Sequence, residues 1–175
     1  NVLASDASSV APAMNDFFNS LQDANSDPSS IASREVVLDR AEQLAQRFQG
    51  LESQFEDTQD EVNERIQGAV NAVNDLGQSI AAINKRITSI SDPSNNQAAN
   101  DLMDQRDQLV QELSGYIDVD TTMQENGALN VFMGSGITLV VDNVAQAVKA
   151  VPDDSYPDRL QIQAGSAGKE MDITS

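Results

Sequence analysis

A group of three aspartates and one arginine is the part of this chain whose residue types and spacing could carry out chemistry. Asp101, Asp104 and Asp107 follow one another at intervals of three residues, and Arg106 lies among them. Carboxylates in such an arrangement could hold a divalent cation or act as a general acid and base. The chain contains no histidine and no cysteine, which excludes imidazole catalysis, thiol nucleophiles and the usual zinc sites.

A helical placement of residues 101–117 gives the arginine a structural role instead. At 100° per residue, one apolar stripe collects Leu102, Met103, Leu109, Val110, Leu113 and Tyr116. Arg106 falls in the middle of that stripe. It lies five, two and one residues from the aspartates, whereas an ion pair within a helix needs a spacing of three or four. We therefore expect Arg106 to reach across to another helix, where its guanidinium finds a carboxylate or free backbone carbonyls.

The aspartates then serve the start of this helix. Asp104 and Asp107 point away from the apolar stripe and Asp101 lies at its edge, so their charges complement the helix dipole, and Asn100 or Asp101 can act as the N-cap. A calcium or magnesium site would need several oxygen ligands that converge on one point. A hydrolase would need two carboxylates across a cleft. We predict no catalytic residue, no metal site and no cofactor, with cation binding and catalysis as the alternatives.

A long helix is expected to hold this segment in place. The residues of its heptad seam, which contains one stutter, are Leu44, Phe48, Leu51, Phe55, Thr58, Val62, Ile66, Ala69, Val73, Leu76, Ile80, Ile83, Ile87 and Ile90. The pattern predicts an unbroken helix whose seam is sealed lengthwise in a narrow stalk. Two helices split at Gly50 or Gly68 are the alternative.

Shorter helices are predicted on either side of the long one. The first contains Phe17 and Phe18 and is followed by a break, after which Asp27 is the expected N-cap and Pro28 the first helical residue. The last helix follows a loop at residues 91–97 and stops at Gly115. The packing residues expected in the three helices are Phe17, Phe18, Phe48, Phe55, Leu76, Ile80, Ile83, Ile87, Leu102, Leu109 and Leu113.

After Gly115 the apolar period changes to two, which predicts an antiparallel β region. A three-residue loop at 125–127, with Gly127 left-handed, pairs Met123 with Leu129 and Thr121 with Val131, so that one face of the hairpin is dry. Further strands are expected at 137–141, 146–151, 160–164 and 169–174. The fold class is therefore mainly α with an antiparallel β part: an elongated helical rod over residues 1–115, then a β-meander over 116–175 that begins a larger β domain.

Composition limits the partners. Lys and Arg total 10 against 28 Asp and Glu, a formal net charge of −18, which argues against nucleic acid or an anionic membrane because phosphate binding needs clustered cations. The longest apolar runs are far below a membrane span. Residues 1–25 lack the basic start and apolar stretch of a secretory signal. We expect a soluble, acidic, non-enzymatic protein that, if exported, leaves the cell without a cleaved signal peptide.

Four collinear segments carry a family resemblance. They lie at residues 14–48, 70–87 ("VNAVNDLGQSIAAINKRI"), 100–113 ("NDLMDQRDQLVQEL") and 127–140 ("GALNVFMGSGITLV"). Together they resemble the family of the first hook-associated protein of bacterial flagella, which lies at the hook–filament junction. Members of that family are several times longer, so the chain is similar to a central fragment.

The resemblance implies a structural protein that is exported through the flagellar type III channel and adapts the hook to the filament. The implied partners are further copies of itself in a ring, the hook protein, the second hook-associated protein, and an export chaperone that binds segments absent here. The alternatives are a related axial protein such as flagellin, or a coiled-coil type III translocator or effector. The lack of a long apolar segment counts against the translocator.

Overall fold

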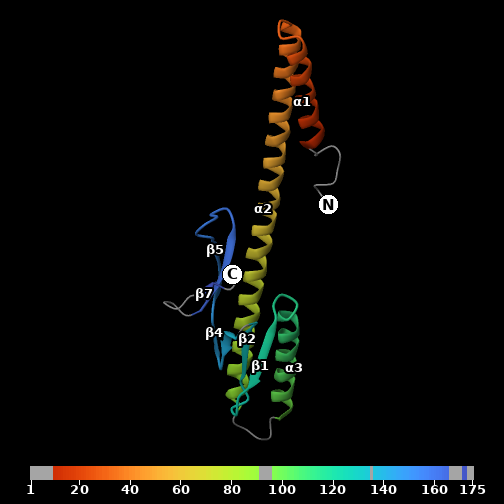
Figure 1. Ribbon diagram of the computed structural model, residues 1–175. Coiled ribbons are helices and arrows are strands. Elements are labelled where there is room, and N and C mark those ends of the chain that lie inside the picture. The colour runs from red at the N-terminus through yellow and green to blue at the C-terminus, as the bar shows by residue number, and fades with distance from the viewer. Residues whose placement is uncertain (1–9, 91–95, 135, 166–170, 173–175) are drawn as a thin grey trace. The chain divides into compact units, whose positions relative to one another are not determined.

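The computed structural model describes residues 10–90, 96–134, 136–165 and 171–172 (Figure 1). Within these residues, three helices come first and seven strands follow. The helices are α1 (Val10–Ser26), α2 (Ile31–Thr88) and α3 (Asn96–Leu113). The strands are β1 (Val119–Met123), β2 (Leu129–Met133), β3 (Ile137–Val141), β4 (Val144–Ala145), β5 (Val148–Pro152), β6 (Leu160–Ala164) and β7 (Met171–Asp172). The predicted fold class, mainly helical with an antiparallel β part, is confirmed.

The chain divides into two compact units, Asn1–Glu61 and Val62–Ser175, and the division falls inside α2. The first unit contains α1 and the first part of α2, which run side by side as a helical hairpin (Figure 1). The second unit contains the rest of α2, α3 and the strands. The predicted division at 115/116 marks the change from helix to strand, and as a domain boundary it stays a prediction.

The long helix α2 runs unbroken for 58 residues. The prediction of one long helix is confirmed, and the alternative of a split at Gly50 or Gly68 is wrong, since both glycines lie inside it. Its start differs from the prediction. Ser30, and not Asp27, is the N-cap, because the Ser30 hydroxyl accepts a hydrogen bond from the Ser33 N–H at 3.2 Å. The Asp27 carbonyl instead accepts from the Ser30 N–H and closes the turn that contains Pro28.

Helix α3 starts earlier than expected, at Asn96. Asp101 therefore lies in the second turn and is not an N-cap; its carboxylate accepts a hydrogen bond from the Gln97 side chain at 3.0 Å. The helix ends close to the predicted stop. The Ser114 N–H still bonds to the Val110 carbonyl, and the Gly115 N–H turns back to Glu112 at 3.0 Å.

The strands form two antiparallel sheets, in the orders β1-β2-β3-β4 and β5-β6-β7. The single meander expected from the sequence is thus two, and the short strand β4 was not predicted. The hairpin between β1 and β2 has the predicted register, with Met123 opposite Leu129 and Thr121 opposite Val131. Gly127 closes the loop at φ +84°, the left-handed conformation that the three-residue loop requires.

The core of the second unit lies where α2 meets α3 and both sheets. Its buried side chains are Val70, Val73, Leu76, Ile80, Ala81, Leu113, Leu129, Val131, Met133, Leu139, Val140, Val148 and Ala164, and a smaller cluster holds Ile83, Ile87 and Leu102. Figure 1 shows α3 and the β1–β4 sheet beside the C-terminal end of α2, with β5 further back along the same helix. The later part of the heptad seam is therefore covered by α3 and strands, where the sequence had suggested helices alone.

Close approach at a glycine contributes to this packing. An added Cβ on Gly77 would lie 3.4 Å from the nearest atom of the Leu139 side chain. Because Gly77 has no side chain, β3 can place this fully buried leucine directly against the helix. The Leu139 side chain therefore packs into the space that a side chain at position 77 would occupy.

Replacing Gly127 with alanine is expected to lower the free energy of unfolding by about 1–2 kcal/mol, because an L-residue is strained at positive φ. The added Cβ would also lie 3.3 Å from Ile87 Cγ2. Thermal or urea unfolding of the chain measures the effect. Gly68→Ala is the control: Gly68 is helical and open, with no atom within 4 Å of an added Cβ, so this change should stabilise by up to about 1 kcal/mol. Two changes of the same sign would contradict the prediction.

Candidate functional site: arginine and asparagine clamps on the long helix

Arg106 lies fully inside the second unit, with 1% of its surface exposed. One guanidinium nitrogen, Nη1, donates to the Gly127 carbonyl at 2.9 Å and to the Asn84 side-chain oxygen at 3.3 Å. The other, Nη2, contacts Met123 Sδ at 3.8 Å. The guanidinium of Arg106 in α3 thus bonds to Asn84 of α2 and to Gly127 in the loop of the β1–β2 hairpin. The sequence predicted a carboxylate or carbonyls as its partners, and the structure supplies a carbonyl and a side-chain amide.

The charge of Arg106 has little compensation in this position. Its Nε lies 4.0 Å from the Asp107 carboxylate, which is 72% exposed, and Nε has no hydrogen-bond partner among the described residues. Burial lowers the pKa of Arg106 below its ordinary value, and the nearby Asp107 carboxylate partly opposes this shift. Since the ordinary arginine pKa is so high, the group stays charged at neutral pH. The hydrogen bonds to Gly127 and Asn84 must therefore offset the desolvation of a full charge.

Asn84 is the centre of the network, and it is completely buried. Its amide nitrogen donates to the carbonyls of Leu129 at 2.8 Å and Asp142 at 2.6 Å. Its oxygen accepts from the Leu129 N–H at 3.0 Å and from Arg106. An asparagine side chain can make four hydrogen bonds, and all four are made here. One side chain of α2 therefore connects α3, the start of β2 and the turn after β3.

Two more asparagines of α2 bind strands in the same way. The Asn74 amide donates to the Val148 carbonyl and accepts from the Val148 N–H, both at 2.8 Å. The Asn63 amide donates to the Asp158 carbonyl at 2.7 Å and accepts from the Leu160 N–H at 3.2 Å. In both cases the side-chain amide takes the place of a neighbouring strand's peptide group. We call Asn63, Asn74 and Asn84 the asparagine clamps.

The spacing of the clamps matches the strands that they hold. Asn63 and Asn74 are eleven residues apart, about 16 Å along a helix. β5 spans about 13 Å from Val148 to Pro152, and the chain continues past it to the turn held by Asn63. The β5–β6 hairpin is therefore fastened to α2 near both of its ends.

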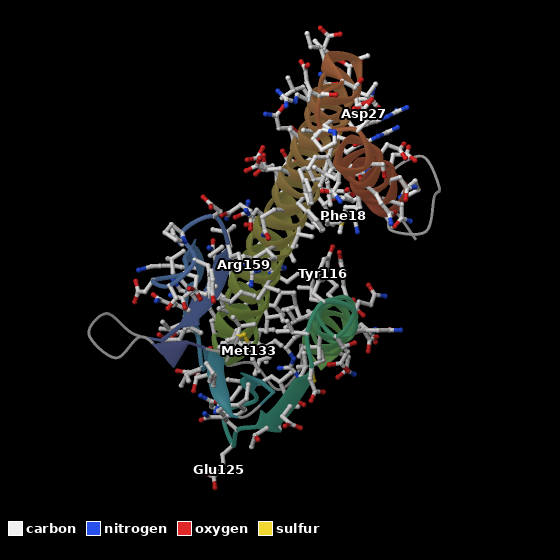
Figure 2. The ribbon with its side chains drawn as sticks, turned by 45° about the horizontal axis from the view of Figure 1, so that its top comes forward. Phe18, Asp27, Tyr116, Glu125, Met133 and Arg159 are labelled. Carbon is white, nitrogen blue, oxygen red and sulfur yellow. The ribbon has the colours of Figure 1, made fainter. Side chains whose placement is uncertain are left out.

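The structure places the predicted packing residues in two groups. Leu76, Ile80, Ile83, Ile87, Leu102 and Leu113 are buried, and Leu109 packs against them. In the first unit the exposure is high: Phe48 is 51% exposed and Phe55 57%. Phe18 is also exposed on α1 (Figure 2), with its ring centroid 5.7 Å from that of Phe17. The described residues of the first unit do not cover this half of the seam.

Asp101, Asp104 and Asp107 are exposed on α3. The sequence had assigned Arg106 to none of them, but the Asp107 carboxylate lies 4.0 Å from Arg106 Nε and makes a long ion pair with it. Among the described residues, no three acidic side chains come together in a way that could hold a metal ion. What the arrangement can do is mechanical, since it joins helix to strand through buried polar contacts. The sequence reasoning missed the clamps. The available signal was that asparagine is unfavourable inside a helix, and Asn84 adjoins the apolar positions Ile80, Ile83 and Ile87.

Arg106→Ala is expected to lower the free energy of unfolding by about 2–4 kcal/mol, because it leaves a cavity and an unpaired Gly127 carbonyl. Asp107→Ala, one residue away and exposed, should change it by less than about 0.5 kcal/mol. Chemical denaturation of the two variants measures both values. Arg106→Met keeps most of the stem and removes the charge, so it should cost less than alanine. Equal, small losses for Arg106→Ala and Asp107→Ala would refute the role of the arginine.

Asn74→Ala is expected to lower the free energy of unfolding by about 1–3 kcal/mol, because the N–H and the carbonyl of the buried Val148 both lose their hydrogen-bond partner. Hydrogen exchange should show the Val148 amide losing protection more than the amides of β2. The matched control is Asn71→Ala, three residues earlier on α2, whose exposed side chain bonds only to Gln67 in the described structure. Equal unfolding free energies for the Asn74→Ala and Asn71→Ala variants would show that the pairing of the Asn74 amide with Val148 does not stabilise the fold.

Comparison with known proteins identifies relatives over nearly the whole chain. Residues 1–175 match the family model described as the flagellar hook-associated protein FlgK helical domain. The chain is 33% identical over 170 residues to flagellar hook-associated protein 1 of Escherichia coli strain K12, which covers 96% of this chain and 31% of that protein. It is 26% identical over 150 residues to the protein of the same name from Bacillus subtilis strain 168, covering 85% of this chain and 29% of that protein.

A solved structure agrees with these sequence matches. The flagellar hook junction protein FlgK from Burkholderia pseudomallei superposes with a TM-score of 0.80 at 30% identity, over 94% of this chain and 30% of that one. The chain thus spans about a third of the length of the relatives that it matches.

Proposed function

Because this chain belongs to the FlgK family of flagellar hook-associated proteins, we propose that the full-length protein carrying it is a structural component of the bacterial flagellum. Its role would be to adapt the hook to the filament at their junction. The observation that carries the proposal is the match of residues 1–175 to the helical domain of that family, together with 33% identity to a flagellar hook-associated protein over 96% of the chain.

The described site fits a protein that bears load and does no chemistry. Buried polar groups in an enzyme usually converge on a cavity where a substrate can bind, whereas Arg106 and the asparagine clamps each bond to backbone groups of this chain. No described helix combines the length and the apolar character that a membrane crossing requires. The internal hydrogen bonds of Arg106 and the asparagine clamps support the proposal of a structural role without catalysis.

The exposed apolar side chains of the first unit suggest where other segments pack. Phe18, Phe48 and Phe55 lie exposed on α1 and α2, and exposed apolar patches of this kind mark interaction surfaces. We propose that helices of the full-length protein outside these 175 residues cover them. The packing role of Phe17, Phe18, Phe48 and Phe55 is part of this proposal.

The proposed partners are further copies of the same protein, the hook protein and the second hook-associated protein. An export chaperone would bind segments outside this sequence. The proposed location is the flagellum outside the cell, reached through the type III export channel without a cleaved signal peptide. The charge of −18 supports a protein that binds neither nucleic acid nor an anionic membrane.

Supplying the full-length protein to bacteria that lack their own junction protein tests the proposal. We expect filaments to reappear on the hooks and swimming to recover, scored by electron microscopy and by motility in soft agar. The same cells with an empty vector give the baseline. Cells that stay without filaments although the protein is exported, with the protein bound to membranes, would reject the junction role in favour of a translocator.

A further inference from the structure

The β5–β6 hairpin ends in a turn whose backbone is fixed from within. The Asp153 carboxylate accepts hydrogen bonds from the N–H groups of Ser155 at 2.7 Å and Tyr156 at 2.8 Å. The Asp153 N–H donates to the Arg159 carbonyl, and the Arg159 N–H to the Tyr156 carbonyl, both at 2.8 Å. Asn63 of α2 holds the far side of the turn through Asp158 and Leu160. The conformation of the turn is therefore held by the Asp153 side chain, by backbone hydrogen bonds and by Asn63, and the other side chains of the turn are not needed for it.

Those side chains are displayed outward. Tyr156 is 60% exposed, and the Arg159 guanidinium carbon lies 4.8 Å from its ring centroid. Figure 2 shows Arg159 at this end of the blue hairpin. Asp154 and Asp158 are exposed beside them. Tyrosine and arginine on a preorganised turn are typical of protein-binding surfaces, because little entropy is lost when they dock. The carboxylates make the surface acidic, so its partner should be basic.

The chain carries such a basic surface at the end of α2. Lys85 and Arg86 are adjacent, exposed and in the last turn of the helix. In the described part of the chain their side chains have no ion pair. They complement the helix dipole, and in a chain of net charge −18 they form a local positive surface. We call residues 153–159 the acidic turn and Lys85–Arg86 the basic pair.

One copy cannot join its own two surfaces. The acidic turn is fastened at Asn63, and Lys85 lies 22 residues further along the same helix, about 33 Å away. The β5–β6 hairpin runs from Asn74 towards Asn63, so its turn points away from the basic pair. No side chain bridges that distance.

We propose that the acidic turn of one copy docks on the basic pair of a second copy. This inference rests on the proposed function, in which many copies of the chain lie next to one another. Every copy then offers one surface of each sign, and head-to-tail pairing of this type continues from copy to copy. If the α2 helices of neighbours run parallel, the neighbours are displaced along the helix by about 33 Å.

Charge reversal in the full-length protein tests the pairing, in bacteria that lack their own junction protein. The first variant carries Lys85→Glu and Arg86→Glu, and the second carries Asp154→Lys and Asp158→Lys. Asp153 is left unchanged because it holds the turn. Each variant should reduce the fraction of cells with filaments at least several-fold. The four changes combined in one chain should restore most of that fraction, since the pair is again complementary with the signs exchanged.

A charge-matched control separates pairing from net charge. Lys85→Glu and Arg86→Glu combined with Glu112→Lys and Asp118→Lys restore the same net charge at other exposed positions of the second unit, and this chain should not recover. Circular dichroism melts and the amount of exported protein show that each variant folds and leaves the cell.

Three results would overturn the pairing of copies: normal filaments with either reversed pair, no recovery of the exported four-change chain, or equal recovery of the charge-matched control. The second result would mean that the two surfaces bind different proteins. Failure of the unaltered protein to restore filaments would reject the proposed function itself, and the inference with it.

Discussion

Side-chain amides that pair with strand backbone hold the second unit together. A strand edge beside a helix normally leaves peptide groups without partners, because the helix uses its own N–H and C=O groups internally. In this chain Asn63, Asn74 and Asn84 supply the missing groups from α2. Since each amide both donates and accepts, it satisfies an N–H and a C=O together. The apolar core can then form between a helix and sheets while the buried peptide groups of Val148 and Leu129 keep hydrogen-bond partners.

Arg106 depends on the same arrangement. A buried guanidinium without a close carboxylate is costly, and it is tolerated because Asn84 and the Gly127 carbonyl face it from two other elements. Asn84 in turn orients its oxygen towards both Arg106 and Leu129. The result connects three segments that are far apart in sequence: the hairpin loop, α3 and the end of α2.

Sequence periodicity predicted the parts of the fold that depend on repeated local choices. The long helix follows from its heptad seam, and the β1–β2 register follows from the demand for one dry face and from Gly127. The position of Arg106 within an apolar stripe also pointed to burial. The clamps were beyond prediction because each is a single asparagine whose partner lies 45 to 97 residues away. The heptad spacing of apolar residues is the same before and after Val62. The sequence pattern therefore could not predict that the described residues bury only the later part of the seam.

The long helix also fixes the distances between the strands of the second unit, because Asn63, Asn74 and Asn84 bind them at set positions along α2. Gly77 lies between the clamps, and its missing side chain faces Leu139. Adding or removing one residue between Asn63 and Asn84 would turn everything beyond it by 100° and slide it by about 1.5 Å. Gly77 would then no longer face Leu139. At least one of the asparagine clamps would also lose its hydrogen bonds to a strand. Insertions and deletions should therefore be excluded from this stretch of twenty-odd residues, while the helix before Val62 could change by whole heptads and keep its apolar face.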